Sequence, residues 1–83
     1  MPLFMDTHHH VEGLTADAVA QAHEADLKTQ EKHGVKYLRY WFDEQSGKVF
    51  CLVEAPNKEA AIAVHREAHG LVADEIIEVK EGS

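Results

Sequence analysis

The order in which strand-like and helix-like segments follow one another constrains the fold of this chain most tightly. Strands are indicated by short runs of β-branched and aromatic residues, and helices by apolar residues spaced three and four positions apart. Thr15 and Asn57 are placed to cap the two helical patterns, and Gly34 and Gly70 to end them. The sequence therefore predicts strands at residues 3–7, 35–42, 48–54 and 75–79, and helices at residues 16–32 and 58–69.

The order β-α-β-β-α-β is that of the ferredoxin-like fold, an α+β fold. We expect a four-stranded antiparallel sheet with both helices on one face, formed by a single domain over residues 1–83. The apolar stripe of each predicted helix should pack on the sheet. The stripes contain Val19, Ala20, His23, Leu27 and Gln30 in the first helix, and Ala61, Val64, His65, Ala68 and Val72 in the second.

The second face of the predicted sheet is also rich in apolar residues. In the second strand Tyr37 and Trp41 should point to one face, and Leu38, Tyr40 and Phe42 to the other. A face exposed to solvent normally alternates to polar residues, and neither face of this strand does. A chain of 83 residues is also near the lower limit for a self-sufficient core. We therefore expect a homodimer that packs sheet on sheet.

Composition excludes several classes of protein. The formal charge of −7 argues against a nucleic-acid partner, which would need a basic patch. A single cysteine, Cys51, rules out an internal disulfide framework. The sequence shows neither a signal-peptide pattern nor an apolar stretch of membrane-spanning length. We expect a cytoplasmic protein without a membrane partner.

Histidine is the residue type most over-represented in the chain. There are seven in 83 residues, where a usage of roughly 2% would give about two. His65 and His69 are four residues apart, so they share a helix face and can chelate one ion. In the predicted topology, the end of the first strand, the first helix and the end of the second helix meet at one sheet edge. The triplet at residues 8–10, His23 and the His65/His69 pair should therefore converge there.

This convergence predicts a metal site. The candidate ligands are His8, His9, His10, His23, His65, His69, Cys51 and Asp6. Cys51 would add a thiolate if it faces the helices, and Glu24, Asp26 and Glu54 offer further carboxylates. Many imidazoles with few thiolates favour Ni(II), Cu(II) or Zn(II) over an iron–sulfur cluster. Because neutral imidazole is the ligand, binding should weaken as the pH falls through about 6.

Each candidate also has an ordinary structural interpretation. His23 fits a hydrogen-bonded core residue, the His65/His69 pair fits a solvated helix end, and Cys51 fits a small buried apolar residue. His33 lies near the C-terminus of the first helix, where the helix dipole favours it, and we assign it no metal role.

The alternative function is a small dimeric ferredoxin-like enzyme, of the monooxygenase or isomerase kind. In such an enzyme a histidine and a carboxylate, Asp6 or Glu54, would act as an acid–base pair. An apolar cavity with room for a substrate would favour this enzyme, whereas convergent ligands alone would favour a metal-binding protein. A metal-responsive DNA-binding regulator is disfavoured by the negative charge and by the missing basic helix.

Several segments resemble the small bacterial nickel-binding proteins of ferredoxin-like fold. They are Met5-Asp6-Thr7-His8-His9, Ala22-His23 with Asp26-Leu27, Phe50-Cys51-Leu52-Val53-Glu54-Ala55-Pro56, and Val64-His65, Ala68-His69-Gly70 and Ala73-Asp74-Glu75-Ile76. The run around Cys51 is the most specific, and the resemblance covers nearly the whole chain. It implies a dimeric domain that binds Ni(II) for sequestration, buffering or delivery. His10 and His33 lie outside the matching motifs.

Overall fold

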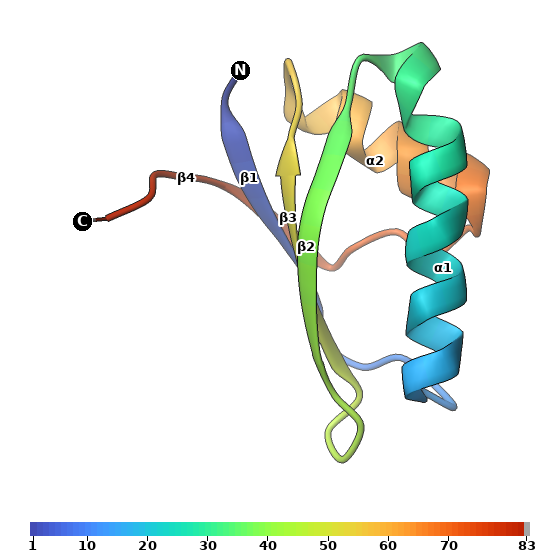
Figure 1. Cartoon of the computed structure of the whole chain (residues 1–83). Helices are drawn as coiled ribbons and strands as arrows, with labels where there is room; N and C mark the ends of the chain where they lie inside the picture. The colour runs from blue at the N-terminus through green and yellow to red at the C-terminus, as the bar shows by residue number, and fades with distance from the viewer. Residues whose placement is uncertain (83) are drawn as a thin grey trace.

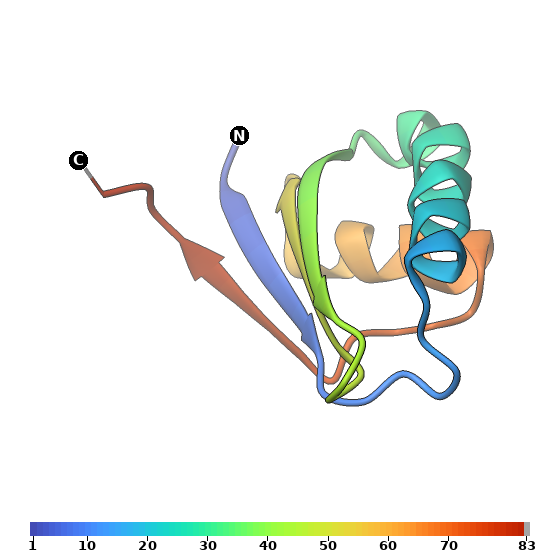
Figure 2. The same cartoon turned by 60° about the horizontal axis from the view of Figure 1, so that its bottom comes forward.

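The computed structural model describes residues 1–82, and its elements follow the predicted order (Figure 1). The strands are β1 (Leu3–His8), β2 (Lys36–Asp43), β3 (Lys48–Glu54) and β4 (Glu75–Val79), and the helices are α1 (Ala16–Thr29), the 3₁₀ helix η1 (Gln30–His33) and α2 (Lys58–Ala68). The sheet has the order β2-β3-β1-β4, and all neighbouring strands are antiparallel. Both long helices cover the same face of the sheet (Figure 2). The predicted ferredoxin-like fold is confirmed.

Local signals in the sequence fix where the helices begin. The Thr15 hydroxyl accepts a 3.1 Å hydrogen bond from the amide of Ala18, and the Asn57 side chain accepts one of 2.9 Å from Ala60. The first helix is shorter than predicted, because α1 ends at Thr29 and the chain tightens into η1. Gly34 then ends η1 in a left-handed conformation, with φ of 67°, which glycine adopts without strain.

The buried side of α1 is rotated from the predicted stripe. Val19 and Asp26 are buried, whereas Ala20 is exposed and Leu27 is 43% exposed, so the stripe was wrong at those two positions. The reason is electrostatic, because the Asp26 carboxylate is held inside the protein by hydrogen bonds from two histidines. In α2 the buried residues are Ala61, Val64 and His65, as predicted. The prediction was wrong for Val72, which is 39% exposed and lies beyond the end of α2 at Ala68.

An irregularity in β2 changes which of its side chains face the helices. The register shifts between Tyr37 and Arg39, so Tyr37 lies opposite Val53 and Tyr40 lies opposite Cys51. Directly opposed residues share a face, and Val53 and Cys51 are both buried beneath the helices. Tyr37 and Tyr40 therefore share a face, and the prediction that they point to opposite faces was wrong. An extra residue in one strand resets the alternation in this way.

The face of the sheet away from the helices, which we call the open face, is largely apolar. Trp41 and Ile77 are 47% and 51% exposed, and they lie opposite Phe50 and Met5, which alternate with buried residues of β3 and β1. Within residues 1–82, no helix combines the length and hydropathy needed to cross a bilayer. The core lies between the other face and the helices, around the fully buried Val53, Ala61 and Val64.

Candidate metal centre

Three chemically active side chains come from two adjacent strands. Asp6 and His8 are two residues apart on β1, so both point toward the helices. Cys51 on β3 lies directly opposite Asp6 in the register and therefore shares that face. All three are buried. The strand geometry thus places a carboxylate, an imidazole and a thiol together under the helices.

The fourth side chain, His65, descends from α2 and is buried between two carboxylates. Its Nε2 is 3.0 Å from Asp6 Oδ2, and its Nδ1 is 2.9 Å from Asp26 Oδ1. An ionised carboxylate can only accept, so both ring nitrogens donate and the ring is an imidazolium. Burial lowers the pKa of His65, but the hydrogen bonds to Asp26 and Asp6 outweigh it and raise the pKa to about 11.

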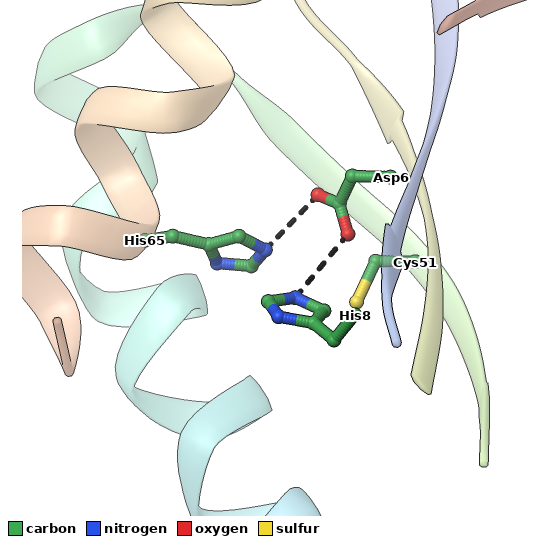
Figure 3. A group of neighbouring side chains, drawn as sticks. All are labelled: Asp6, His8, Cys51 and His65. Atoms are coloured by element: carbon green, nitrogen blue, oxygen red, sulfur yellow. Dashed lines mark hydrogen bonds and ion pairs between the residues drawn. The ribbon is translucent and has the colours of Figure 1, made fainter. Parts of the chain in front are cut away.

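Together these residues form a set of four donors, shown in Figure 3. Asp6, His8, Cys51 and His65 each offer a ligand atom, and the four atoms lie within 4.8 Å of one another. One carboxylate oxygen, two imidazole nitrogens and one sulfur match the ligand types and number of transition-metal sites. We call this set the metal centre.

One atom of the metal centre lacks a hydrogen bond. Among residues 1–82, Asp6 Oδ1 is buried without one, and its contact with His8 Nε2, at 3.5 Å, is only an ion-pair contact (Figure 3). A buried polar atom without a partner costs about 1–3 kcal/mol, and more if it is charged. A cation bound beside Oδ1 would satisfy it. The residues present therefore fit a metal ion.

The protonation states of the metal centre follow from burial and hydrogen bonding. Burial raises the pKa of Asp6, but the hydrogen bond from His65 and the nearby His8 ring lower it to about 2. Burial raises the pKa of the Cys51 thiol to about 11. At neutral pH, without metal, Asp6 is ionised, Cys51 is a thiol and His65 is protonated.

A second group of residues holds the metal centre from outside. Asp26 Oδ1 accepts hydrogen bonds from His65 Nδ1 and, at 3.0 Å, from His69 Nε2. His69 Nδ1 in turn accepts a 3.1 Å hydrogen bond from the amide of Leu71. The Tyr37 hydroxyl lies 3.3 Å from Asp6 Oδ2. Histidines that bind metals usually donate their other ring N–H to a carboxylate, and the Asp26–His65 pair has this form.

The remaining predicted ligands lie apart from the metal centre. His9 is exposed, and its backbone amide donates to Asp74. His10 is also exposed, with Nδ1 donating to the Ser46 carbonyl oxygen and Nε2 lying 3.2 Å from Glu12. The structure thus separates these two residues from His8.

His23 and His69 line the same pocket as three residues of the metal centre. The His23 ring packs on Tyr40, with centroids 4.7 Å apart. His69 lies beside His65, with ring centroids 4.9 Å apart. Asp26, His65 and His69 form a second set of possible donor atoms, on the Nδ1 side of the His65 ring.

Two residues of this region were not singled out from the sequence. Asp26 appeared among several possible carboxylates and within one segment of the family resemblance, with no role assigned to it, although its spacing of seven residues from Val19 places it on the same helix face. That spacing was a usable signal. Tyr37 reaches Asp6 from β2, and nothing in the local sequence pattern indicates that contact.

A cavity of about 70 Å³ adjoins the metal centre on the side of α1. Its walls are mainly apolar side chains of α1 and the segment before it, with Leu71 from the segment after α2. His8, Cys51 and His65 also line it. The metal centre therefore borders an apolar space.

Comparison with known proteins gives two matches. The sequence model of the family described as nickel responsive protein SCO4226-like matches residues 4–79, a range that includes all four donors. Among solved structures, the crystal structure of SCO4226 from Streptomyces coelicolor A3(2) is similar, with 42% sequence identity and a TM-score of 0.90. The match covers 98% of this chain and 99% of that chain. A search of curated proteins gives no match.

Proposed function

This chain belongs to the SCO4226-like family of nickel responsive proteins, and from that premise we propose that it binds one divalent metal ion in the metal centre. The ligands in this proposal are Asp6, His8, Cys51 and His65. The observation that carries it is the buried Oδ1 of Asp6, which has no hydrogen bond within residues 1–82 and lies among three other donor atoms. A buried oxygen without a hydrogen bond lowers the stability of the protein, and a bound cation would remove that penalty.

We propose Ni(II) as the ion, with Zn(II) and Cu(II) as competitors. The description of the family supports nickel. The donor set is compatible with all three ions, because imidazole and thiolate bind each of them and selectivity depends on geometry and supply. The Asp6 carboxylate and a Cys51 thiolate would balance the charge of a bound divalent ion. Unbalanced charge is unfavourable inside a protein.

Sequestration, buffering or delivery of the ion fits the structure better than catalysis. The four donors are buried, and the adjoining cavity has a volume of about 70 Å³. Sites for small-molecule substrates usually measure roughly 300–1,000 Å³. The adjoining cavity is smaller than this, but a neighbouring pocket of about 310 Å³, lined by His8, His10 and Glu12, falls within the range. The preference for metal binding over an enzyme therefore rests on the four convergent donors.

In this proposal, Asp26 and His69 position the ligands and do not bind the ion. Asp26 fixes the His65 tautomer by accepting its Nδ1–H, which leaves Nε2 for the ion. Both ring nitrogens of His69 are engaged, one by Asp26 and one by the Leu71 amide. This assignment replaces the chelate of one ion by His65 and His69 that the four-residue spacing suggested.

We further propose that the protein is a cytoplasmic homodimer without a nucleic-acid or membrane partner. The apolar open face of the sheet supports the dimer. A reducing compartment would keep Cys51 available as a ligand, and the charge of −7 disfavours nucleic acid.

Calorimetric titration with Ni(II) tests the proposed function. We expect one ion per chain, and an affinity at least about tenfold lower in Asp6→Asn, His8→Gln and Cys51→Ser, because each variant removes a donor. His9→Gln and His33→Gln are matched controls, since these side chains lie outside the metal centre, and they should retain the wild-type affinity. Circular dichroism verifies folding. Equal affinity in the donor variants, or loss of binding in His9→Gln, would contradict the proposal.

A further inference from the structure

A second pocket, of about 310 Å³, lies at the end of β1, between two connecting segments. One segment joins β1 to α1 and contributes Val11 and Gly13, with Ala18 from α1 beside them. The other segment joins α2 to β4 and contributes Leu71 and Val72. Both segments lie along the lower side of the molecule in Figure 2. We call this space the loop pocket.

His8 connects the loop pocket to the metal centre. Among residues 1–82, it is the one donor of the metal centre that lines the loop pocket. Its side chain is 9% exposed, so about nine-tenths of it is buried. Its Nε2 makes only the 3.5 Å contact with Asp6, and its Nδ1 has no polar contact within the described part of the chain. A buried imidazole without a hydrogen bond thus lies at the boundary between the loop pocket and the other donors.

The size of the loop pocket suits a hydrated ion. A divalent transition-metal ion in water carries about six water molecules, which occupy roughly 180 Å³ at about 30 Å³ each. The loop pocket exceeds this volume, whereas the cavity beside α1 measures about 70 Å³. Of the two spaces that reach the metal centre, the loop pocket is therefore the one with room for the ion and its waters.

The rim of the loop pocket carries groups that attract a cation. Glu12 and Asp74 provide carboxylates and His10 an imidazole, and no lysine or arginine within residues 1–82 lines the pocket. Asp74 is held by a 2.7 Å hydrogen bond from the His9 amide, whereas the Glu12 side chain is 95% exposed and contacts only the His10 ring among these groups. Carboxylates around a concave surface raise the local concentration of cations.

We propose that the loop pocket is the entrance through which a hydrated divalent cation reaches the metal centre, and that His8 is the first donor it meets. The inference rests on the proposed function, because an entrance needs a site behind it. It assigns to Glu12 and Val72 an effect on the rate of uptake, separate from the affinity that the four donors determine.

Rates distinguish an entrance from a ligand. A change that narrows the route raises the barrier in both directions, so uptake and release slow by the same factor and the dissociation constant is unchanged. Val72 lines the loop pocket and not the cavity beside α1. We expect Val72→Trp to slow Ni(II) uptake and release by at least about fivefold each, with a dissociation constant within about twofold of wild type. Stopped-flow absorption measures uptake, and mixing the loaded protein with excess EDTA measures release.

Two variants control for the added bulk. Leu27→Trp introduces the same ring at an exposed position of α1 that lines neither space, and it should leave both rates unchanged. Ala22→Leu narrows only the cavity beside α1, and it should also leave them unchanged. Val72→Phe replaces Val72→Trp if circular dichroism shows that the latter misfolds.

The charge at the rim gives a second test. Glu12→Gln should slow uptake by about two- to threefold at low salt, and the difference should shrink at high salt because exposed charges are screened. Glu59→Gln removes the same charge from the exposed start of α2, outside the loop pocket, and should leave uptake unchanged.

The outcomes separate the two proposals. Failure of the wild-type protein to bind Ni(II) would overturn both. Binding of Ni(II) with unchanged rates in the Val72 variant would overturn the entrance alone, and so would weaker binding in that variant without slower release. Slower uptake in Ala22→Leu would place the route beside α1, and equal slowing by Glu12→Gln and Glu59→Gln would overturn the role of the rim.

Discussion

At the scale of single residues, His65 connects the metal centre to the rest of the protein. One ring nitrogen faces Asp6 and the other faces Asp26, so the ring can pass from a doubly hydrogen-bonded imidazolium to a ligand without moving far. The sequence placed His65 on the inward face of its helix, and that prediction was correct. Its carboxylate partners come from β1 and α1, and only the folded chain brings them together.

Metal uptake should release protons at neutral and mildly alkaline pH. His65 and Cys51 both have a pKa raised to about 11, so about two protons should leave for each ion bound between pH 7 and 9. The affinity should therefore keep rising with pH above 6, the value at which unperturbed histidines would become neutral. Calorimetry in buffers of different ionisation enthalpy measures the number released. Release of no proton would contradict the assigned protonation states.

Removing the carboxylate that positions His65 should weaken binding although it is not a ligand. We expect Asp26→Ala to lower the Ni(II) affinity by about 10–100-fold, and Asp26→Asn to recover part of it, because the amide oxygen can still accept the Nδ1–H of His65. Glu24→Ala, on the exposed side of the same helix, is the control. A competition titration with a metal indicator measures the affinities. Equal effects at Asp26 and Glu24 would argue against positioning.

At the scale of elements, the sequence predicted the positions of the strands and helices well. It predicted less well which side chains of α1 and β2 face the core. Apolar runs and caps are local signals, so β3 and β4 were predicted with their observed bounds. The shift in β2 depends on pairing with β3, and the inward turn of Asp26 depends on histidines of another segment. These non-local contacts decided that Tyr37 faces Asp6 and that Asp26 supports the metal centre.

The turn between β2 and β3 should be sensitive to its glycine. Gly47 has φ of 80°, and a Cβ there would lie 2.7 Å from His10 Nδ1, whereas Gly13 has φ of 69° with nothing among the described residues within 4 Å of a Cβ. Both Gly47→Ala and Gly13→Ala place an alanine at positive φ, which is unfavourable for any residue with a Cβ. The exposed His10 ring can swing aside, but the Val11 backbone amide, 3.2 Å from the added Cβ, cannot do so as easily. Gly47→Ala should therefore lower the free energy of unfolding by about 0.5 kcal/mol more than Gly13→Ala. Urea denaturation measures both, and equal losses would contradict the contact.

At the scale of the whole molecule, the metal centre and the open face lie on opposite sides of one sheet. Asp6 and His8 point from β1 toward the helices, while Met5 and Thr7 alternate to the other face. Apolar patches of this kind on small proteins mark interfaces. A dimer formed through this face would cover it and leave the cavity side unobstructed.

Charged substitutions on the open face should dissociate the proposed dimer. Trp41→Arg and Ile77→Arg each place a charge on an apolar surface that a second copy would bury. Leu27→Arg is the control, because Leu27 is exposed on α1, away from the open face. Sedimentation at micromolar concentration should show a dimer for the wild type and Leu27→Arg and a monomer for the other two. A monomeric wild type would contradict the dimer.

X-ray absorption at the nickel edge of the Ni(II)-loaded protein tests the central claim most directly, because it reports which atoms bind the ion. The proposed ligand set predicts one sulfur scatterer, from Cys51, together with two imidazole rings, from His8 and His65. Cys51→Ser should remove the sulfur scattering and keep the imidazole contribution. A wild-type spectrum with nitrogen and oxygen ligands only would contradict the proposed metal centre.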